Sequence, residues 1–238
     1  MEKDFLEGEI IYIDKPLRWT SFDAVKRLRG ALLRRYGIKK FKVGHAGTLD
    51  PLATGVMIVC TGKATKRIDE LQAATKEYIA TIALGATTPS YDLETSIDAT
   101  YPVDHITREL VEETLKKFKG RIDQVPPSFS ACKVDGKRAY KMARKGVEVE
   151  LKPKTLVIDE IELIEYNRGH SITVRVVCSK GTYIRALARD IGVALSSGAH
   201  LTGLQRTRIG DVTLSRCMKV DDAVEMIKTV PISPWSQS

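Results

Sequence analysis

Asp50 has the setting in this chain that most favours chemistry, because it lies in a glycine-rich segment, GHAGTLDPLATG, at residues 44–55. The glycines remove side chains from this segment, and glycine readily adopts positive φ angles. Pro51 biases Asp50 toward an extended backbone and removes one hydrogen-bond donor. The segment therefore presents a single carboxylate to a close partner. From these residues alone, an aspartate that caps a turn is as good an interpretation as a catalytic group.

Two other kinds of site fit this segment poorly. A cradle for a nucleoside triphosphate needs the pattern GxxxxGK[ST], and the sequence GKAT at residues 62–65 is only a fragment of it. His45 and Asp50 are possible metal ligands, but no third or fourth ligand follows at a recognisable spacing. We therefore expect neither a triphosphate site nor a metal site here.

Three further residues are candidates to act with Asp50. Arg185 is predicted in the first turn of a helix, where the helix dipole disfavours an arginine unless a carboxylate or phosphate faces it. It could pair with Asp50 and lower the pKa of that carboxylate, or pair with a surface acid instead. Tyr78 is either an ordinary core tyrosine or a platform for an unstacked base. His45 either satisfies a loop hydrogen bond or replaces a displaced base.

The elements that must position these residues follow from apolar periodicity. Five segments predict strands: 10–13, 56–60, 77–84, 155–165 and 172–178. The last two form a hairpin across residues 167–170. On the strand at 77–84, Tyr78 shares one face with the alternating apolar residues that follow it.

Three helices are predicted between these strands. The first is capped by Thr20 or Ser21, with a buried side at Phe22, Val25, Leu28 and Leu32. The second runs from Thr107 through Phe118 and ends at Gly120. The third opens at residues 179–182, with a buried side at Ile184, Leu187, Ile191 and Leu195. Because strands and helices do not alternate strictly, the order favours an α+β fold with a mixed sheet.

The charge balance predicts an anionic partner. The chain has 238 residues, a formal net charge of +8 and a pI near 9.3. Eight bases and no acid occur in residues 26–42, six bases against one acid in 132–145, and seven bases against two acids in 175–216. Any one cluster is explained equally well by a helix face exposed to solvent. Three clusters together favour a surface that binds successive phosphates of a nucleic acid.

Cysteine usage and the N-terminus indicate the compartment. The widely spaced residues Cys60, Cys132, Cys178 and Cys217 form no CxxC pair, so we expect buried free thiols rather than a disulfide or a zinc site. The first ten residues do not resemble a signal peptide, and no segment has the length of a membrane span. These features predict a cytosolic (cytoplasmic) protein that does not bind a membrane.

Several motifs in this order resemble the TruB-type tRNA pseudouridine-55 synthases. They are IDKP and WTS within residues 13–21, GHAGTLDPLATG at 44–55, KEY at 76–78, PPSFSACKVDGKRAY at 126–140, SKGTYIR at 179–185 and SGAHLTGL at 197–204. The resemblance covers nearly the whole chain through about residue 215, and the Asp50 segment is its most specific part. It implies the catalytic fold of the pseudouridine synthases, with a largely antiparallel central sheet flanked by helices.

The resemblance also implies an activity, the isomerisation of uridine 55 in the tRNA T-loop to pseudouridine. Asp50 would be the nucleophile, attacking either C1′ of the ribose or C6 of the uracil, and no metal, nucleotide or redox cofactor would be needed. The other implied site residues each have a role around the flipped uridine. Tyr78 stacks on it, Arg185 pairs with Asp50, His45 fills the vacated T-loop space, Tyr183 and Leu204 line the uracil pocket, Lys15 supports the loop or a phosphate, and Asp92 lies near the pocket.

One departure from the family concerns the C-terminus. Many relatives carry a PUA-type RNA-binding domain after the catalytic core, whereas we expect residues 1–238 to form a single catalytic domain with a tail from about residue 216. The basic clusters at 26–42 and 132–145 would then contribute more of the tRNA binding. We expect a monomer that acts on the T-arm without a guide RNA. The alternative is a non-catalytic tRNA-folding chaperone on the same scaffold.

Overall fold

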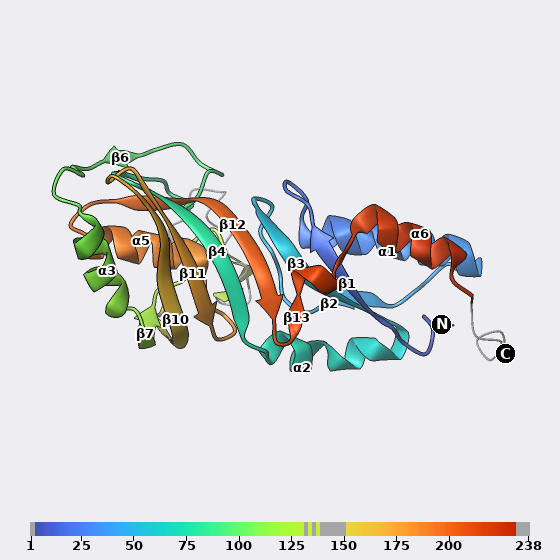
Figure 1. The fold of residues 1–238 in the computed structure, drawn as a ribbon. Helices are drawn as coiled ribbons and strands as arrows, with labels where there is room; N and C mark the ends of the chain where they lie inside the picture. The colour runs from blue at the N-terminus through green and yellow to red at the C-terminus, as the bar shows by residue number, and fades with distance from the viewer. Residues whose placement is uncertain (1–2, 131–132, 135–136, 139–150, 232–238) are drawn as a thin grey trace. The chain divides into compact units, whose positions relative to one another are not determined.

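The computed structural model describes residues 3–130, 133–134, 137–138 and 151–231 (Figure 1). The chain divides into two compact units. The first comprises Met1–Lys76 and Gln205–Ser238, and the second comprises Glu77–Leu204. The fold is α+β with a mostly antiparallel sheet and flanking helices, which confirms the predicted class.

The sheet of the first unit is built around two long strands. β1 (Ile10–Lys15) pairs antiparallel with β3 (Ala53–Thr61), and its other edge pairs in parallel with the short β14 (Met218–Lys219). β2 (Val43–His45) also pairs with β3. The part of β12 (Ala199–Ile209) that belongs to this unit lies beside β3 and pairs with β13 (Val212–Thr213). The buried strand predicted at 56–60 is confirmed, and it is part of the longer β3.

Helices complete the first unit. They are η1 (Gly62–Arg67), α2 (Ile68–Ala73), η2 (Leu214–Arg216), α1 (Ser21–Tyr36) and α6 (Val220–Thr229). The last two lie side by side and share a core with β1 and β3 (Figure 1). None of the helices in the described part of the chain is long and apolar enough to cross a membrane.

The start of α1 follows from its capping residues. Thr20 accepts a hydrogen bond from the Asp23 amide, and the Asp23 carboxylate accepts one from the Thr20 amide, which forms a capping box. The buried side consists of Ser21, Ala24, Val25, Leu28, Ala31 and Leu32. The prediction that Phe22 belongs to this side is wrong, since Phe22 is 61% exposed. Because each residue turns the helix by about 100°, the position after Ser21 faces away from the core.

Gly30 lies in the interior of α1 without a conformational need for glycine. Its φ is not positive, and a Cβ built on it would meet only the Arg34 side chain, at an ordinary 3.6 Å. Glycine in a helix interior costs roughly 1 kcal/mol relative to alanine. We therefore expect Gly30→Ala to raise the free energy of unfolding by about 0.5–1 kcal/mol, measured by urea denaturation. A loss of stability would contradict this description of the helix surface.

The second unit has its own antiparallel arrangement of strands. β4 (Lys76–Leu84) begins at the boundary and lies between the N-terminal part of β12 and β11 (Ser171–Cys178). β10 (Lys154–Asn167) pairs with β11 as the predicted hairpin and with β7 (Gly120–Gln124) on its other edge. Two short pairs, β5 (Ala86–Thr87) with β6 (Ala99–Thr100) and β8 (Lys133–Val134) with β9 (Lys137–Arg138), lie outside this sheet.

Two helices pack within this unit: α3 (Arg108–Lys116), against β10, and α5 (Ile184–Ala194). Thr107 caps α3 as predicted, but the helix ends at Lys116 rather than at Phe118, and Gly120 begins β7. The buried residues of α5 include the predicted Ile184, Leu187 and Ile191, and Leu195 at its C-cap is also buried.

The described cysteines are free thiols. Cys60 and Cys178 are buried, as predicted, whereas Cys217 is partly exposed. Burial and the nearby Asp14 carboxylate nevertheless raise the pKa of the Cys217 thiol to about 11. Cys132 lies outside the described residues.

Candidate active site

The loop that carries Asp50 connects β2 to β3. Its end is a tight turn in which the Ala53 amide donates to the Asp50 carbonyl at 3.0 Å. Gly47 and Gly55 have φ angles of +104° and +108°, so both need glycine. A Cβ on Gly55 would lie 2.2 Å from the backbone oxygen of Arg206. The close approach expected from the glycines is therefore made, at Gly55, to the protein's own strand β12.

Arg206 fixes the inner side of this loop. It is 1% exposed, and its guanidinium donates to the carbonyls of Val56 at 2.8 Å, Gly47 at 3.1 Å and Thr48 at 3.4 Å. Burying an arginine costs little free energy only when its N–H groups donate hydrogen bonds, and these three carbonyls accept them. The sequence counted Arg206 among the bases of the cluster at 175–216. No alternation of apolar residues around it distinguishes it from the partly exposed Arg208, so the sequence held no signal for its burial.

The start of α1 fixes the outer side of the loop. The Ser21 hydroxyl accepts from the Leu49 amide at 2.8 Å and donates to the Leu49 carbonyl at 3.1 Å. The Arg18 amide donates to the Pro51 carbonyl at 2.7 Å. The residues on both sides of Asp50 are thus anchored to one segment. The sequence offered Ser21 only as a possible helix cap, and Thr20 takes that role instead.

Lys15 lies beneath the same segment. Its side chain is fully buried, and its ammonium donates to the carbonyls of Pro16 at 2.9 Å and Trp19 at 2.5 Å. Burial lowers the pKa of Lys15 to about 8, against the opposing attraction of the Asp50 carboxylate. Lys15 therefore faces backbone oxygens inside the unit and interacts electrostatically with Asp50.

This lowered pKa predicts a pH dependence of stability. Because the pKa is about 8 in the folded chain and 10.5 for an ordinary lysine, the unfolded chain binds more protons between these values. The free energy of unfolding should therefore rise with pH across this window, by roughly 3 kcal/mol in total from this group. Between about pH 7.5 and about pH 9.5, urea denaturation should show about 2 kcal/mol of this gain for the parent chain relative to Lys15→Met. An equal pH response in the two proteins would contradict it.

His45 is the last residue of β2. Its Nδ1 atom is buried and has no hydrogen-bond partner among the described residues. Burial, followed by the positive charge of Arg206, lowers the pKa of the imidazole. The ring is therefore neutral at neutral pH, which suits insertion among bases better than a charged ring would.

Arg185 is one of the buried charged residues of the second unit. It lies in the first turn of α5, as predicted, and is 4% exposed. Its guanidinium donates to the carbonyls of Ser90 at 3.0 Å and Phe129 at 2.8 Å. These acceptors offset the unfavourable position at the helix N-terminus. The pairing of Arg185 with Asp50 stays a prediction.

Asp92 is brought to Arg185 by the loop between β5 and β6. One carboxylate oxygen lies 3.9 Å from the Arg185 Nε atom. The other accepts from the Ser90 hydroxyl at 2.6 Å and from the Glu94 amide at 2.9 Å. Asp92 thus organises the loop whose Ser90 carbonyl holds Arg185.

The remaining predicted residues also lie in the second unit. Tyr78 is 8% exposed on the inward face of β4, as its alternation predicted. Tyr183 precedes α5, and its backbone exchanges two hydrogen bonds with the Gln124 side chain, at 2.9 and 3.2 Å. Leu204 lies partly buried on β12. Their contacts with a uracil stay predictions, as do those of the first-unit residues with RNA.

Three of the seven bases in the cluster at 175–216, which the sequence favoured as part of a phosphate-binding surface, are held within the protein. Arg185 and Arg206 are buried, as described above, and Arg175 pairs with carboxylates of its own unit. Its partners are Glu77 at 3.0 Å, Glu160 at 2.6 Å and Glu162 at 3.2 Å. Most of the cluster at 132–145 lies outside the described residues.

Residues 34–184 match the family model "TruB family pseudouridylate synthase (N terminal domain)". The chain belongs to the TruB family. It is therefore an isomerase of the pseudouridine synthase class, as the sequence motifs implied.

Two relatives define its place among TruB proteins. The tRNA pseudouridine synthase B of Phocaeicola vulgatus is 70% identical over 224 residues, which are 94% of this chain and 95% of that protein. The tRNA pseudouridine synthase B of Flavobacterium johnsoniae is 53% identical over 219 residues, which are 92% and 95% of the two chains.

Two solved structures contain a chain with a similar fold. A chain in the crystal structure of a Cbf5-Nop10-Gar1 complex matches with a TM-score of 0.70 and 30% identity, over 93% of this chain and 54% of that one. A chain in a structure of an H/ACA RNP bound to a substrate RNA containing 2′-deoxyuridine matches with a TM-score of 0.66 and 28% identity, over 93% and 53%. This TruB chain spans about half the length of those proteins.

In the described part of the chain, no three or more His, Cys, Asp or Glu residues are grouped so as to hold a metal ion. The anchored carboxylate of Asp50 is a group that can form a covalent bond to an electrophilic carbon.

Proposed function

We propose that this chain converts uridine 55 in the T-loop of tRNA to pseudouridine, with Asp50 as the nucleophile. The observation that carries the proposal is the anchored Asp50 loop, held by Arg206 on one side and by Ser21 and Arg18 on the other. Identity of 70% to a tRNA pseudouridine synthase B supports tRNA as the substrate.

The reaction moves one bond and needs no net oxidant or reductant. Asp50 attacks either C1′ of the ribose or C6 of the uracil, and the bond between C1′ and N1 breaks. The uracil stays bound, rotates, and forms a new bond from C5 to C1′. In the C1′ route this bond displaces the carboxylate from C1′, whereas in the C6 route the carboxylate leaves C6 afterwards. In both routes C5 loses a proton and N1 gains one. A loop fixed at both ends favours this step because little of it must be ordered when the substrate binds.

The other residues act around this step. Tyr78 stacks on the flipped uracil and assists loss of the C5 proton, while Tyr183 and Leu204 line the uracil pocket. Arg185 pairs with Asp50 and keeps it ionised, and Asp92 positions Arg185. His45 occupies the T-loop space that the flipped nucleotide leaves. For Lys15, its carbonyl partners favour support of the loop over contact with a phosphate.

The cellular setting is part of the same proposal. We place the protein in the cytoplasm, as a monomer whose 238 residues act as one catalytic domain on the T-arm without a guide RNA. A single assay tests the function: the purified chain is incubated with an unmodified T-arm hairpin, and pseudouridine is measured. Formation of pseudouridine by the chain alone is expected. Binding without conversion would favour the tRNA-folding chaperone, and conversion only with an added guide RNA would favour a guided enzyme.

A further inference from the structure

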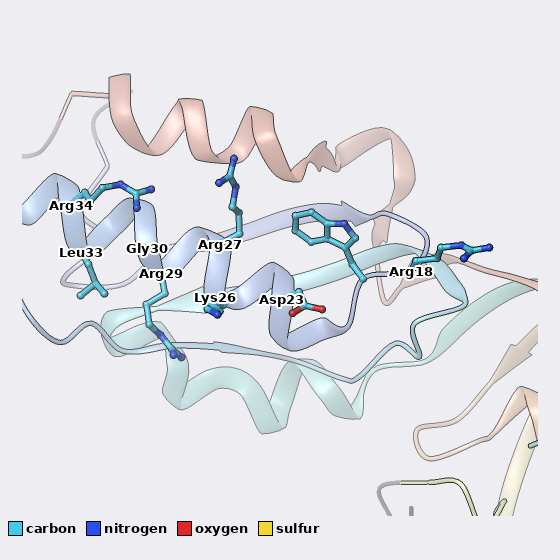
Figure 2. Close-up of a pocket in the computed structure, with 9 residues that line it drawn as sticks. Arg18, Asp23, Lys26, Arg27, Arg29, Gly30, Leu33 and Arg34 are labelled. Carbon is cyan, nitrogen blue, oxygen red and sulfur yellow. The ribbon is translucent and has the colours of Figure 1, made fainter. Parts of the chain in front are cut away.

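The outer face of α1 carries a depression of about 680 Å³ (Figure 2). Its size is in the range of ligand-binding sites. Its lining includes five cations, Arg18, Lys26, Arg27, Arg29 and Arg34, against the single acid Asp23. The carboxylate of Asp23 is already engaged by the Thr20 amide and hydroxyl, at 2.9 and 2.6 Å. The depression therefore has a strong excess of positive charge.

The five cations divide into two groups. Arg29 donates to the Val43 carbonyl at 2.9 Å, and Arg27 pairs with Asp221 of α6 at 3.3 Å, so both are directed to the protein (Figure 2). The side chains of Arg18, Lys26 and Arg34 make no hydrogen bond or ion pair with any described residue. Figure 2 shows Arg18 beyond the start of the helix and Arg34 toward its end, with Lys26 between them. Three cations along one face are thus available to an outside partner.

Gly30 forms the floor between two of these cations. Lys26, Gly30 and Arg34 follow each other in steps of four, so they lie in one row along the helix. At 1.5 Å per residue, the two cations are based about 12 Å apart. A Cβ on Gly30 would lie 3.6 Å from Nη1 of Arg34, so the Arg34 guanidinium lies over the glycine. The missing side chain leaves room for this cation in the same row as Lys26, where a chain with repeated negative charges can contact both.

An aromatic residue completes the lining. Trp19 is half-buried and lines the same depression. Arginine and lysine bind phosphates, and a neighbouring aromatic ring offers a stacking surface for a base. This combination matches a sugar-phosphate backbone better than an acidic peptide, which offers no base to stack.

The depression is also linked to the Asp50 loop. Arg18 holds Pro51 through its amide, and the Trp19 carbonyl accepts from Lys15. We propose that this depression binds the phosphodiester backbone of the substrate RNA and thereby sets the position of the RNA relative to Asp50. The proposal rests on the proposed function, since it names a second contact of the same RNA.

Salt-dependent tRNA binding tests the two cations. In an Asp50→Asn background, so that the RNA is not converted, Lys26→Gln/Arg34→Gln should weaken binding of an unmodified tRNA transcript about tenfold at 0.1 M salt. It should also lower the slope of log K against log salt by about 2, because two phosphate contacts are lost. Arg108→Gln/Lys228→Gln is the matched control, with the same residue types on exposed helix faces. An unchanged slope, or an equal fall in the control, would overturn the proposal.

A second variant tests the depression without changing charge. Gly30→Leu should fill the floor and weaken tRNA binding about fivefold, while the midpoint of thermal unfolding stays equal or rises. Unchanged affinity in this variant would also overturn the proposal. Failure of the proposed function has a different signature. The chain with Asp50 intact would then form no pseudouridine, while the binding measurements would still report whether the depression holds RNA.

Discussion

Asp50→Asn should lower the rate of pseudouridine formation by at least about 10⁴-fold, because an amide cannot act as the nucleophile. Binding of unmodified tRNA should stay within about twofold of the parent chain, since asparagine has nearly the same shape and the loop keeps its anchors. The measurement is single-turnover release of tritium from C5-labelled uridine in a tRNA transcript, together with an affinity measurement.

The control is Asp159→Asn, which removes an exposed acid on β10. It should keep the activity of the parent chain. Thermal unfolding should show that Asp50→Asn is folded. Substantial turnover by a folded Asp50→Asn protein would contradict both the assignment of Asp50 as the nucleophile and the mechanism based on it.

Gly55→Ala should be the most destabilising small substitution in the Asp50 loop. The new Cβ would lie 2.2 Å from the Arg206 oxygen and 2.8 Å from its nitrogen, and alanine is strained at a φ of +108°. Since both atoms belong to backbone, no side chain can move aside. We expect a loss of at least about 3 kcal/mol in the free energy of unfolding, by urea denaturation, with loss of activity.

Gly30→Ala is the matched control for this substitution. The same chemical change, in the same unit, is expected to have the opposite sign, because Gly30 has neither a positive φ nor a backbone neighbour. A Gly55→Ala protein within about 0.5 kcal/mol of the parent would show that β3 and β12 can separate at no cost. The close approach of these strands would then not be what holds the loop.

The elements of this fold were predictable where a local pattern determined them. The alternation from Tyr78 to Leu84 and the cap at Thr107 both depend on neighbouring residues, and both are confirmed. The predicted buried side of α1 is wrong at Phe22, because the sequence does not distinguish a large apolar residue at the surface from one in the core. Apolar periodicity indicates which face of a helix is mostly buried, but it cannot identify a single apolar residue that lies outside that face.

The supports of the site were not predictable, because they act over long distances in sequence. The bond from Arg206 to Gly47 joins residues 159 positions apart, and that from Ser21 to Leu49 joins residues 28 apart. A charge cluster in sequence does not distinguish Arg206, buried under the loop, from Arg34 at the surface. The motifs located Asp50, whereas only the folded chain shows what holds its loop.

The dependence of the Asp50 loop on Arg206 also has a consequence for the chain during synthesis. A ribosome that has made residues 1–184 has completed the segment that the family model matches, yet it has not made the arginine under the loop. The first unit itself needs Gln205–Ser238, so its native contacts join the two ends of the chain. Contacts of such high sequence separation carry a loop-closure entropy cost that slows folding. The nascent protein therefore carries its nucleophile from an early stage, but the loop that aims it lacks its arginine support until residue 206 has been made.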